Sequence, residues 1–402
     1  MGIKKVEFYK HNIGEEDVEA LKEVVATPML SQGKWVERAE EKLSKYLGIP
    51  HIVCVSSCTD ALFLSLKASG VKKGDEVITT PFTFIATVNA IEYCGGKPIF
   101  ADVQEETGNI NSEEIQKKIS KKTKAILPVH IYGTLCNMVG IDVIAHQHKI
   151  SIIEDCAHAL DTTGAGLWGL SCYSFYPTKS ITCGEGGAVG CWHEDVAEKL
   201  KILRNHGMNK MAWKRYEGKY EHWEMEELGY KMNMTNLQGC LLLRQLDNIN
   251  NIVATRKERY DTYYEAFRDN PKIRLLQSDK GSSKLYFSIL VDGDKRDDIV
   301  WQLQDKGIGV VVNWRPVHLR QYYARKYGYK EGDFPQAEDI GRRTISIPLY
   351  SKLTAEEQKY VIKCVEDVIG GKSLHFATSP KRGEDNSKGT KRPSCRRAEE
   401  EV

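Results

Sequence analysis

The sequence of 402 residues contains no apolar run close to the roughly 18 residues that suggest a membrane span. Its N-terminus, "MGIKKVEFYKHNIGEEDVEAL", lacks the apolar core of a signal peptide. The formal net charge is only +2, and both signs are mixed along most of the chain, so no electrostatic argument supports a nucleic-acid partner. We therefore expect a cytoplasmic protein that binds neither membrane nor nucleic acid.

The sequence also has no CxxC pair and no fixed-period repeat of the kind that builds a solenoid. Its eleven cysteines are an odd number, and most lie inside apolar runs such as "HIVCVSSC" and "IIEDCAHAL". This pattern favours reduced thiols in a core over a disulfide framework or a zinc site. We expect no metal.

Strand-like and helix-like segments alternate between residues 51 and 155. The first pair is "HIVCVSS", a short buried strand, and "CTDALFLSLKASG", a helix with an apolar face. Further strands follow with helices between them, and the last is "ISIIEDC". This order predicts an α/β fold with a mostly parallel sheet covered on both faces, and ligands at the carboxyl ends of its strands.

The pattern changes near Thr255, where a long polar helix precedes short strands and further helices. We predict a large domain over residues 1–254, including an N-terminal helical segment, and a smaller α+β domain over residues 255–371. Residues 372–402 are polar, charged and poor in aliphatic side chains, which is typical of a disordered tail. Its basic run, "KGTKRPSCRR", is more simply a solvated segment than a localisation signal.

The segment "GAGLWG", Gly164 to Gly169, matches the G-x-G-x-x-G pattern of dinucleotide-binding proteins. That fingerprint follows a strand and opens a helix, whereas this one precedes another strand-like run, "CYSFYP". We interpret it as a loop.

Two candidate sites fall at predicted strand ends. In "SSCTD", Ser57, Thr59 and Asp60 lie where a strand turns into a helix, so the segment is either a plain N-cap or a phosphate cup. In "IIEDCAH", Asp155 ends a buried strand and needs a cationic or N–H partner, which an arginine or a protonated pyridine nitrogen would supply. His158, three residues on, is either a ligand contact or an ordinary loop histidine.

The third site is "SFYPTKSITCGEGG", where Ser174 and Lys179 flank a bend marked by Pro177 and followed by glycines. Together the three sites contain what pyridoxal phosphate requires: a lysine for a Schiff base, an acid for the pyridine nitrogen, and a phosphate cup at a helix start. The combination is more specific than any of its members.

Seven motifs, in order, resemble the nucleotide-sugar aminotransferases of the DegT/StrS group, which have the type I aminotransferase fold. They lie between residues 13 and 369 and read "SSCTDALFLSL", "GDEVITTPFTFIATVNAI", "KAILPVHIYG", "IIEDCAHAL", "SFYPTKSITCGEGGAV", "LRNHG" and "GYKMNMTNLQ". The sequence departs from the group at Cys58, where Gly or Ala is common, and at Met232, where an aromatic is common. Lys179 is present, whereas the related sugar dehydratases carry His there.

The resemblance implies a role for each matching residue. Lys179 would hold the cofactor as a Schiff base, Asp155 would pair with the pyridine nitrogen, and His158 would lie near the phenolic oxygen. The remaining cofactor contacts would be Phe84, stacked on the ring, and a phosphate cup of Thr59, Asp60, Ser174 and, from a second subunit, Asn233. A homodimer with shared active sites is therefore implied.

The resemblance also implies the substrates: an amino donor, usually glutamate, and a nucleotide-linked keto sugar, often a UDP- or dTDP-4-keto-6-deoxyhexose. In "NWRPVHLRQYY", Arg315 and His318 match a segment near the substrate, and Arg315 could pair with the donor carboxylate or the sugar diphosphate, or make no ligand contact. Two other functions stay open. One is a same-fold enzyme acting on another keto substrate, such as a 3-keto sugar, and the other is a regulatory protein that binds pyridoxal phosphate.

Overall fold

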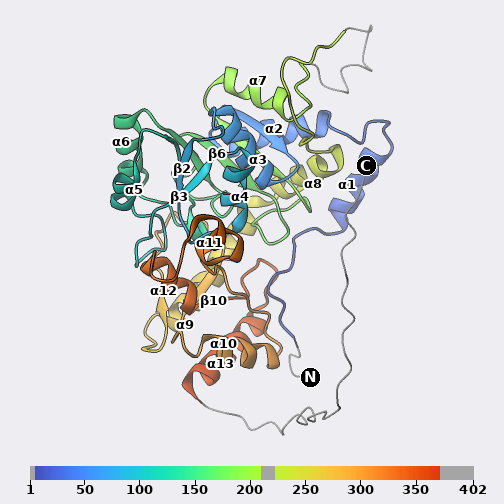
Figure 1. The fold of residues 1–402 in the computed structure, drawn as a ribbon. Helices are drawn as coiled ribbons and strands as arrows, with labels where there is room; N and C mark the ends of the chain where they lie inside the picture. The colour runs from blue at the N-terminus through green and yellow to red at the C-terminus, as the bar shows by residue number, and fades with distance from the viewer. Residues whose placement is uncertain (1–4, 210–221, 372–402) are drawn as a thin grey trace, which may run out of the picture.

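The computed structural model describes residues 5–209 and 222–371, and the tail predicted to be disordered lies outside them. A central sheet of seven strands runs through the upper part of the molecule in Figure 1, in the order β1-β7-β6-β5-β4-β2-β3. The strands are β1 (His51–Val55), β2 (Glu76–Thr79), β3 (Lys97–Phe100), β4 (Thr123–Leu127), β5 (Ser151–Asp155), β6 (Leu170–Ser174) and β7 (Gly187–Cys191). All are parallel except β7, which is antiparallel to both neighbours, so the predicted mostly parallel sheet is confirmed.

Helices cover both faces of this sheet. They are α1 (Glu15–Val25), α2 (Lys34–Leu47), α3 (Cys58–Ala68), α4 (Ile85–Tyr93), α5 (Ser112–Lys118), the short η1 (Ile131–Gly133), α6 (Met138–His148), α7 (Glu194–Leu203) and α8 (Asn236–Asp247). Because side chains alternate along a strand, Val53 of β1 packs on one face with α3, α4 and α7. Its neighbour Ile52 packs on the other face with α2 and α8.

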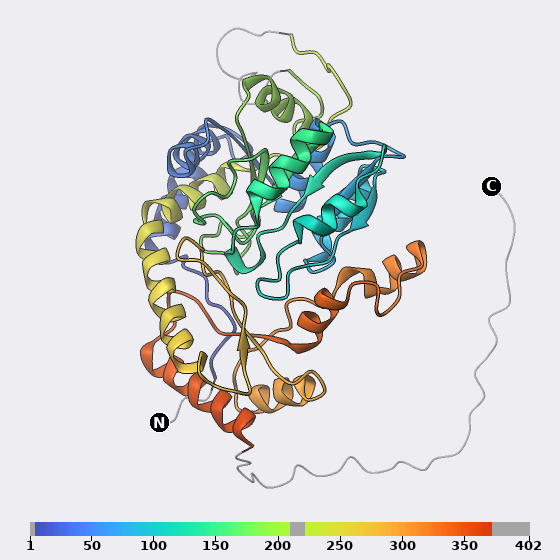
Figure 2. The ribbon, with the colours of Figure 1, turned by 90° about the vertical axis from the view of Figure 1, so that its left-hand side faces the viewer.

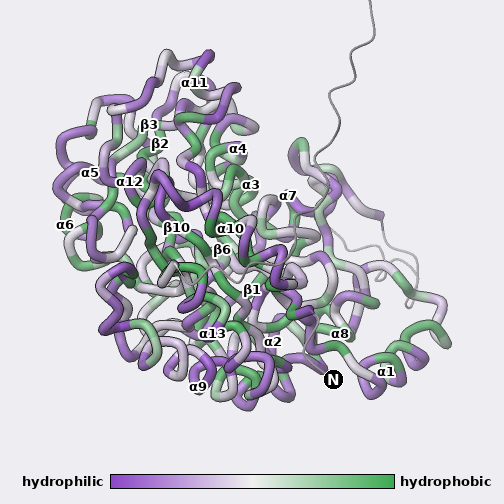
Figure 3. The backbone as a smooth tube through the Cα atoms, turned by 90° about the horizontal axis from the view of Figure 1, so that it is seen from below, coloured by the Kyte–Doolittle hydropathy of each residue, from purple (hydrophilic) through white to green (hydrophobic). Residues whose placement is uncertain are grey.

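A second unit follows, with a three-stranded antiparallel sheet in the order β10-β9-β8 and its own apolar core. Its elements are α9 (Ile249–Phe267), β8 (Arg274–Leu275), β9 (Phe287–Leu290), α10 (Arg296–Asp305), η3 (Val317–Leu319), α11 (Gln321–Tyr327), α12 (Pro335–Arg343), β10 (Thr344–Ile347) and α13 (Ala355–Gly370). In Figure 3 the hydrophobic colour lies mostly on elements in the interior, such as β10, whereas α9 and α11 are mostly hydrophilic. Among the described residues no helix is long and apolar enough to span a membrane.

The division at residue 254 stays a prediction, and the sequence did not indicate two features that cross it. Helix α9 begins at Ile249 and continues through that position without a break. The N-terminal segment runs to the second unit, where Val6 forms a parallel bridge with Ile308 and is buried in its core (Figure 2).

Candidate active site

The carboxyl ends of the parallel strands β1, β6 and β5 meet at one edge of the sheet. Cross-strand pairing aligns Val55 of β1, Gly187 of β7 and Ser174 of β6 in one row. A Cβ on Gly187 would lie 2.4 Å from the carbonyl group of Ser57, so only glycine permits the helix start to pack here. The last glycine of the motif after Lys179, Gly187, is thus required by the approach of α3.

The N-terminus of α3 has the form of an anion site. The Ser57 hydroxyl accepts the Asp60 N–H at 3.1 Å, and the first intrahelical bond joins Ala61 N–H to the Ser57 carbonyl at 3.0 Å. The N–H groups of Cys58 and Thr59 precede that bond and are available to a phosphate. The Asp60 carboxylate accepts the Ser56 hydroxyl at 2.5 Å, so it holds the turn before α3, and its contact with a phosphate stays a prediction.

Asp155 ends β5 and is only 4% exposed. Its carboxylate accepts the Thr87 hydroxyl at 2.8 Å and the Ala157 N–H at 3.1 Å. Burial raises the pKa of Asp155, while these two hydrogen bonds and the charge of Lys179 act to lower it. Lys179 acts on this carboxylate from a distance, and none of the ion pairs of the described residues is made with Asp155 directly, so a protonated pyridine nitrogen would give it a direct cationic partner.

Lys179 lies in the loop between β6 and β7, where its N–H donates to the Tyr176 carbonyl at 2.9 Å. Its ammonium group lies over the ring of Tyr286, 5.8 Å from the centroid. It also lies close enough to influence the pKa values of Asp155 and His158. The structure therefore brings together the lysine, the acid and the histidine that the sequence placed at separate strand ends.

His158 is buried, and its Nδ1 accepts the Tyr132 N–H at 3.3 Å. Because Nδ1 accepts, the proton of the neutral ring is on Nε2, which can donate. Burial and the charge of Lys179 lower the pKa of His158 well below 6.5, so the ring is neutral at pH 7. The Nε2–H group of neutral His158, beside Lys179, is therefore suited to donate to the phenolic oxygen of pyridoxal phosphate.

Two aromatic side chains border this site. Phe84 precedes α4 and is 51% exposed, an unusual position for a large apolar ring. Its centroid is 5.3 Å from that of Trp314, whose ring is nearly parallel to His158, with centroids 6.1 Å apart and an angle of 14°. Phe84 is therefore placed to stack on a planar ligand.

Asn233 lies at the other end of the row of strand ends, in an antiparallel bridge with Val55 of its own chain. The Ser56 N–H donates to the Met232 carbonyl at 2.8 Å, which holds this segment against the phosphate cup. The side-chain oxygen of Asn233 is buried and has no hydrogen-bond partner in the described residues. Its contribution to a second subunit stays a prediction.

The structure does not bring His318 to the site. Its side chain is fully buried, its Nε2–H donates to Glu338 at 2.9 Å, and its ring packs edge-on against Phe334. We therefore assign it a structural role in place of the expected substrate contact. Arg315, in contrast, is exposed. Burial lowers the pKa of Arg320, and the positive charge of Arg315 nearby lowers it further.

Sequence reasoning missed Thr87, Tyr286 and Trp314. Thr87 follows Phe84 by three residues, and that helical spacing could have indicated a shared face. Tyr286 and Trp314 come from the second unit, more than one hundred residues from Lys179, and no local pattern announces such contacts.

A cluster of His130, Glu154 and Cys156 lies next to Asp155, with one ligand-type atom of each within 4.8 Å of the others. Glu154 accepts the N–H groups of Gly166 and Trp168, each at 2.9 Å, and is 3.0 Å from Nε2 of His130. These bonds hold "GAGLWG" as a loop, as predicted.

One residue of the "LRNHG" motif, Arg204, has a structural role. Arg204 is fully buried and donates to Glu40 at 2.6 Å and to the Cys54 carbonyl at 2.5 Å. His206, which we left outside the predicted site, is exposed.

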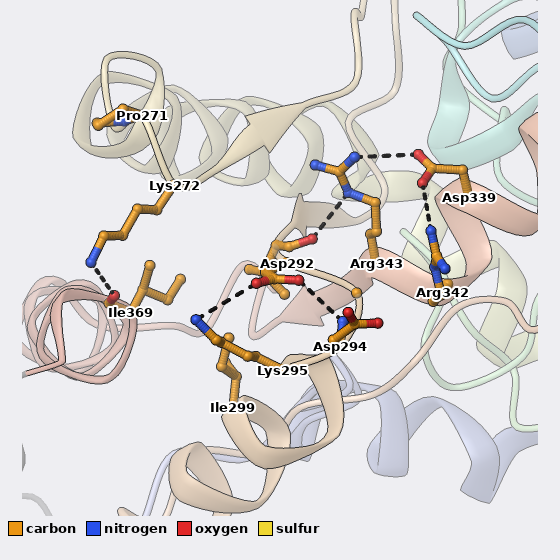
Figure 4. A pocket seen from close by; sticks show the side chains of 12 residues that line it. Pro271, Lys272, Asp292, Asp294, Lys295, Ile299, Asp339, Arg342, Arg343 and Ile369 are labelled. Atoms are coloured by element: carbon orange, nitrogen blue, oxygen red, sulfur yellow. Dashed lines mark hydrogen bonds and ion pairs between the residues drawn. The ribbon is translucent and has the colours of Figure 1, made fainter.

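A separate surface cavity lies in the second unit, between β9, α10, α12 and the end of α13 (Figure 4). Two ion pairs line it, Arg343 with Asp339 at 3.4 Å and Lys295 with Asp292 at 3.7 Å, and Lys272 donates a hydrogen bond to the Ile369 carbonyl at 3.1 Å. It is lined by none of the residues converging on Lys179.

Comparison with known proteins agrees with this geometry. The model of the DegT/DnrJ/EryC1/StrS aminotransferase family matches residues 11–366. The spore coat polysaccharide biosynthesis protein SpsC of Bacillus subtilis (strain 168) is 38% identical over 372 residues, covering 89% of this chain and 96% of that protein.

Two solved structures have the same fold over most of the chain. The putative sugar aminotransferase Spr1654 from Streptococcus pneumoniae, in its PMP-form, has a TM-score of 0.86 at 26% identity, covering 91% of this chain and 100% of that one. Helicobacter pylori PseC, an aminotransferase involved in the biosynthesis of pseudoaminic acid, has a TM-score of 0.85 at 28% identity, covering 92% and 100%.

The fold and the site define a type I, pyridoxal phosphate-dependent aminotransferase. The buried carboxylate of Asp155, which has no direct ion pair among the described residues, the N-terminal N–H groups of α3 and the exposed Phe84 ring all fit that cofactor. The chain belongs to the DegT/DnrJ/EryC1/StrS aminotransferase family.

Proposed function

We propose that the protein transfers an amino group from glutamate to a nucleotide-linked keto sugar, giving an amino sugar for glycan biosynthesis. The acceptor is a UDP- or dTDP-4-keto-6-deoxyhexose. The observation that carries the proposal is the convergence of Lys179 on Asp155 and the neutral His158 beside the exposed ring of Phe84. The names of SpsC and PseC, which refer to polysaccharide and to pseudoaminic acid biosynthesis, support a sugar substrate.

The bound cofactor supplies an electron sink that makes the Cα proton of the amino donor acidic. Lys179 would take that proton with its Nζ and, in the second half of the reaction, return one to the sugar carbon that receives the amine. Asp155, held by Thr87 and the Ala157 N–H, would keep the pyridine nitrogen protonated. His158 would donate its Nε2 proton to the phenolic oxygen, and the α3 N–H groups with Ser174 would hold the phosphate.

The proposed test is a visible absorption spectrum of the holoenzyme before and after glutamate, and then with UDP- and dTDP-linked 4-keto sugars. A yellow band that bleaches with glutamate and returns with one sugar is expected. A band that ignores glutamate would contradict the donor and favour the regulatory alternative. Recovery only with a keto acid or a 3-keto sugar would contradict the acceptor.

Arg315 is proposed to bind the sugar diphosphate. Arg315 is exposed, and Arg320 lies close enough for the two positive charges to interact, which suits a diphosphate better than a single carboxylate. We expect Arg315→Ala to raise KM for the nucleotide sugar about tenfold, with little change in KM for glutamate. The matched control is Arg325→Ala on α11. A rise in KM for glutamate alone would move Arg315 to the donor carboxylate.

A homodimer in the cytoplasm is part of the same proposal. The segment leading to Asn233 exposes Met225 and Leu228, which are 57% and 76% exposed, as expected of side chains that a second subunit covers. The unpartnered oxygen of Asn233 supports a contact made across that interface.

A further inference from the structure

The N-terminal segment, residues 5–13, connects the second unit with the loop that carries Lys179. One side of the segment follows the second unit: Val6 and Gly309 share a backbone hydrogen bond of 2.8 Å, and Lys10 pairs with Glu357 at 2.9 Å. The ring of Phe8 stacks on that of Tyr286, with centroids 5.9 Å apart. The segment therefore packs on the second unit, although it precedes the first unit in the sequence.

Ser180, the residue that follows Lys179, is held by a side chain from the N-terminal segment. Ser180 is 3% exposed. Burial raises the pKa of Asp161 to about 6, and the side chain of Ser180 lies close enough to that carboxyl to act against this shift. The carbonyl oxygen of Ser180 accepts the side-chain N–H of Asn12 at 3.2 Å. This carbonyl belongs to the peptide between Ser180 and Ile181, one peptide beyond the one attached to the Cα of Lys179. Holding it restricts the backbone of Ser180, the direct neighbour of Lys179, and so restricts the backbone that carries the lysine side chain.

Asn12 makes a second hydrogen bond on its other side. Its Oδ1 accepts the hydroxyl of Ser351, which lies between β10 and α13 in the second unit. The orientation of the amide is determined, because the Ser180 carbonyl can only accept and so must face the NH₂ group. One side chain thus joins the second unit to the lysine loop.

We propose that Asn12 is a positioning residue for Lys179, acting through the Ser180 carbonyl, and that Ser351 holds Asn12 in place. The placement of Lys179 then depends on the second unit, which also contributes Trp314 and Tyr286 to the site. Only the kinetic test, the rate of bleaching with glutamate, rests on the proposed amino transfer. The link between Lys179 and the bound cofactor can be followed in the absorption spectrum without any substrate.

The test compares the holoenzyme with Asn12→Ala, which removes both bonds, and with Ser351→Ala, which leaves the bond to Ser180. Lys10→Ala is the matched control, because it removes an exposed contact of the same segment that does not touch the lysine loop. We expect the bleaching rate with glutamate to fall about tenfold for Asn12→Ala and about threefold for Ser351→Ala, with less than about a twofold change for Lys10→Ala.

A second readout separates positioning from stability. The pH at which the visible band of the resting holoenzyme titrates should shift by about half a unit or more in Asn12→Ala. An unchanged titration and bleaching rate, with only a lower thermal unfolding temperature, would overturn the proposal. If the wild-type protein ignores glutamate, the proposed donor is wrong, but the titration still decides the role of Asn12.

Discussion

Lys179→Ala is expected to lower kcat by about three to four orders of magnitude, because the variant lacks the group that moves the proton at the donor Cα. The fold should persist, since Lys179 lies in a loop and contributes no apolar side chain to a core. The measurement is the rate of each half-reaction, followed by absorbance with glutamate and then with the keto sugar.

Lys179→Arg separates charge from chemistry. The guanidinium keeps a positive charge beside Asp155 and His158 but cannot act as a base near pH 7. We expect the same loss of activity as in Lys179→Ala. Turnover of both half-reactions by either variant would remove Lys179 from the mechanism.

Asp155→Asn is expected to lower kcat by about two to three orders of magnitude, because a neutral amide cannot stabilise a protonated pyridine nitrogen. The substitution conserves volume, so cofactor can still occupy the site and its bound spectrum can be recorded. Thr87→Val, which removes one hydrogen bond to this carboxylate, should cost about fivefold in kcat. A fully active Asp155→Asn enzyme would refute the pairing.

Asp155→Asn is also expected to change how the stability of the cofactor-free protein depends on pH. Burial raises the pKa of Asp155 above 3.8, so the folded state holds this proton more tightly than the unfolded state. The resulting stabilisation is complete at low pH and is lost as the pH rises through the pKa of the folded state. Asp155→Asn should therefore be more stable than the wild type at pH 8, and this advantage should shrink as the pH falls towards 4, as measured by denaturant unfolding.

The strand ends show how far sequence reasoning reached. The apolar run before Asp155, the serine before α3 and the glycines after Lys179 are local signals, and each has the structural place expected of it. Parallel strands bring their carboxyl ends to one edge, so a correct alternation of strands and helices was sufficient to predict that these residues meet.

His318 shows where the same reasoning failed. Arg315 nearby is exposed, but His318 is the middle residue of η3, which is anchored to the loop after β2, where the Val317 N–H donates to the Pro81 carbonyl at 2.8 Å. A short polar segment does not reveal which of its side chains will face a core. That depended on Phe334 and Glu338, which come from α12 and its N-terminal flank.

The sequence by itself determined the alternating fold and the local positions of Lys179, Asp155 and the helix start after Ser57, because periodicity and turn residues act over a few positions. Only the tertiary structure decided that Trp314 covers His158, that Val6 belongs to the second core, and that Asn12 reaches Ser180. Those contacts join segments more than one hundred residues apart, and they exist because packing of the two units brings the segments together, which no local pattern specifies.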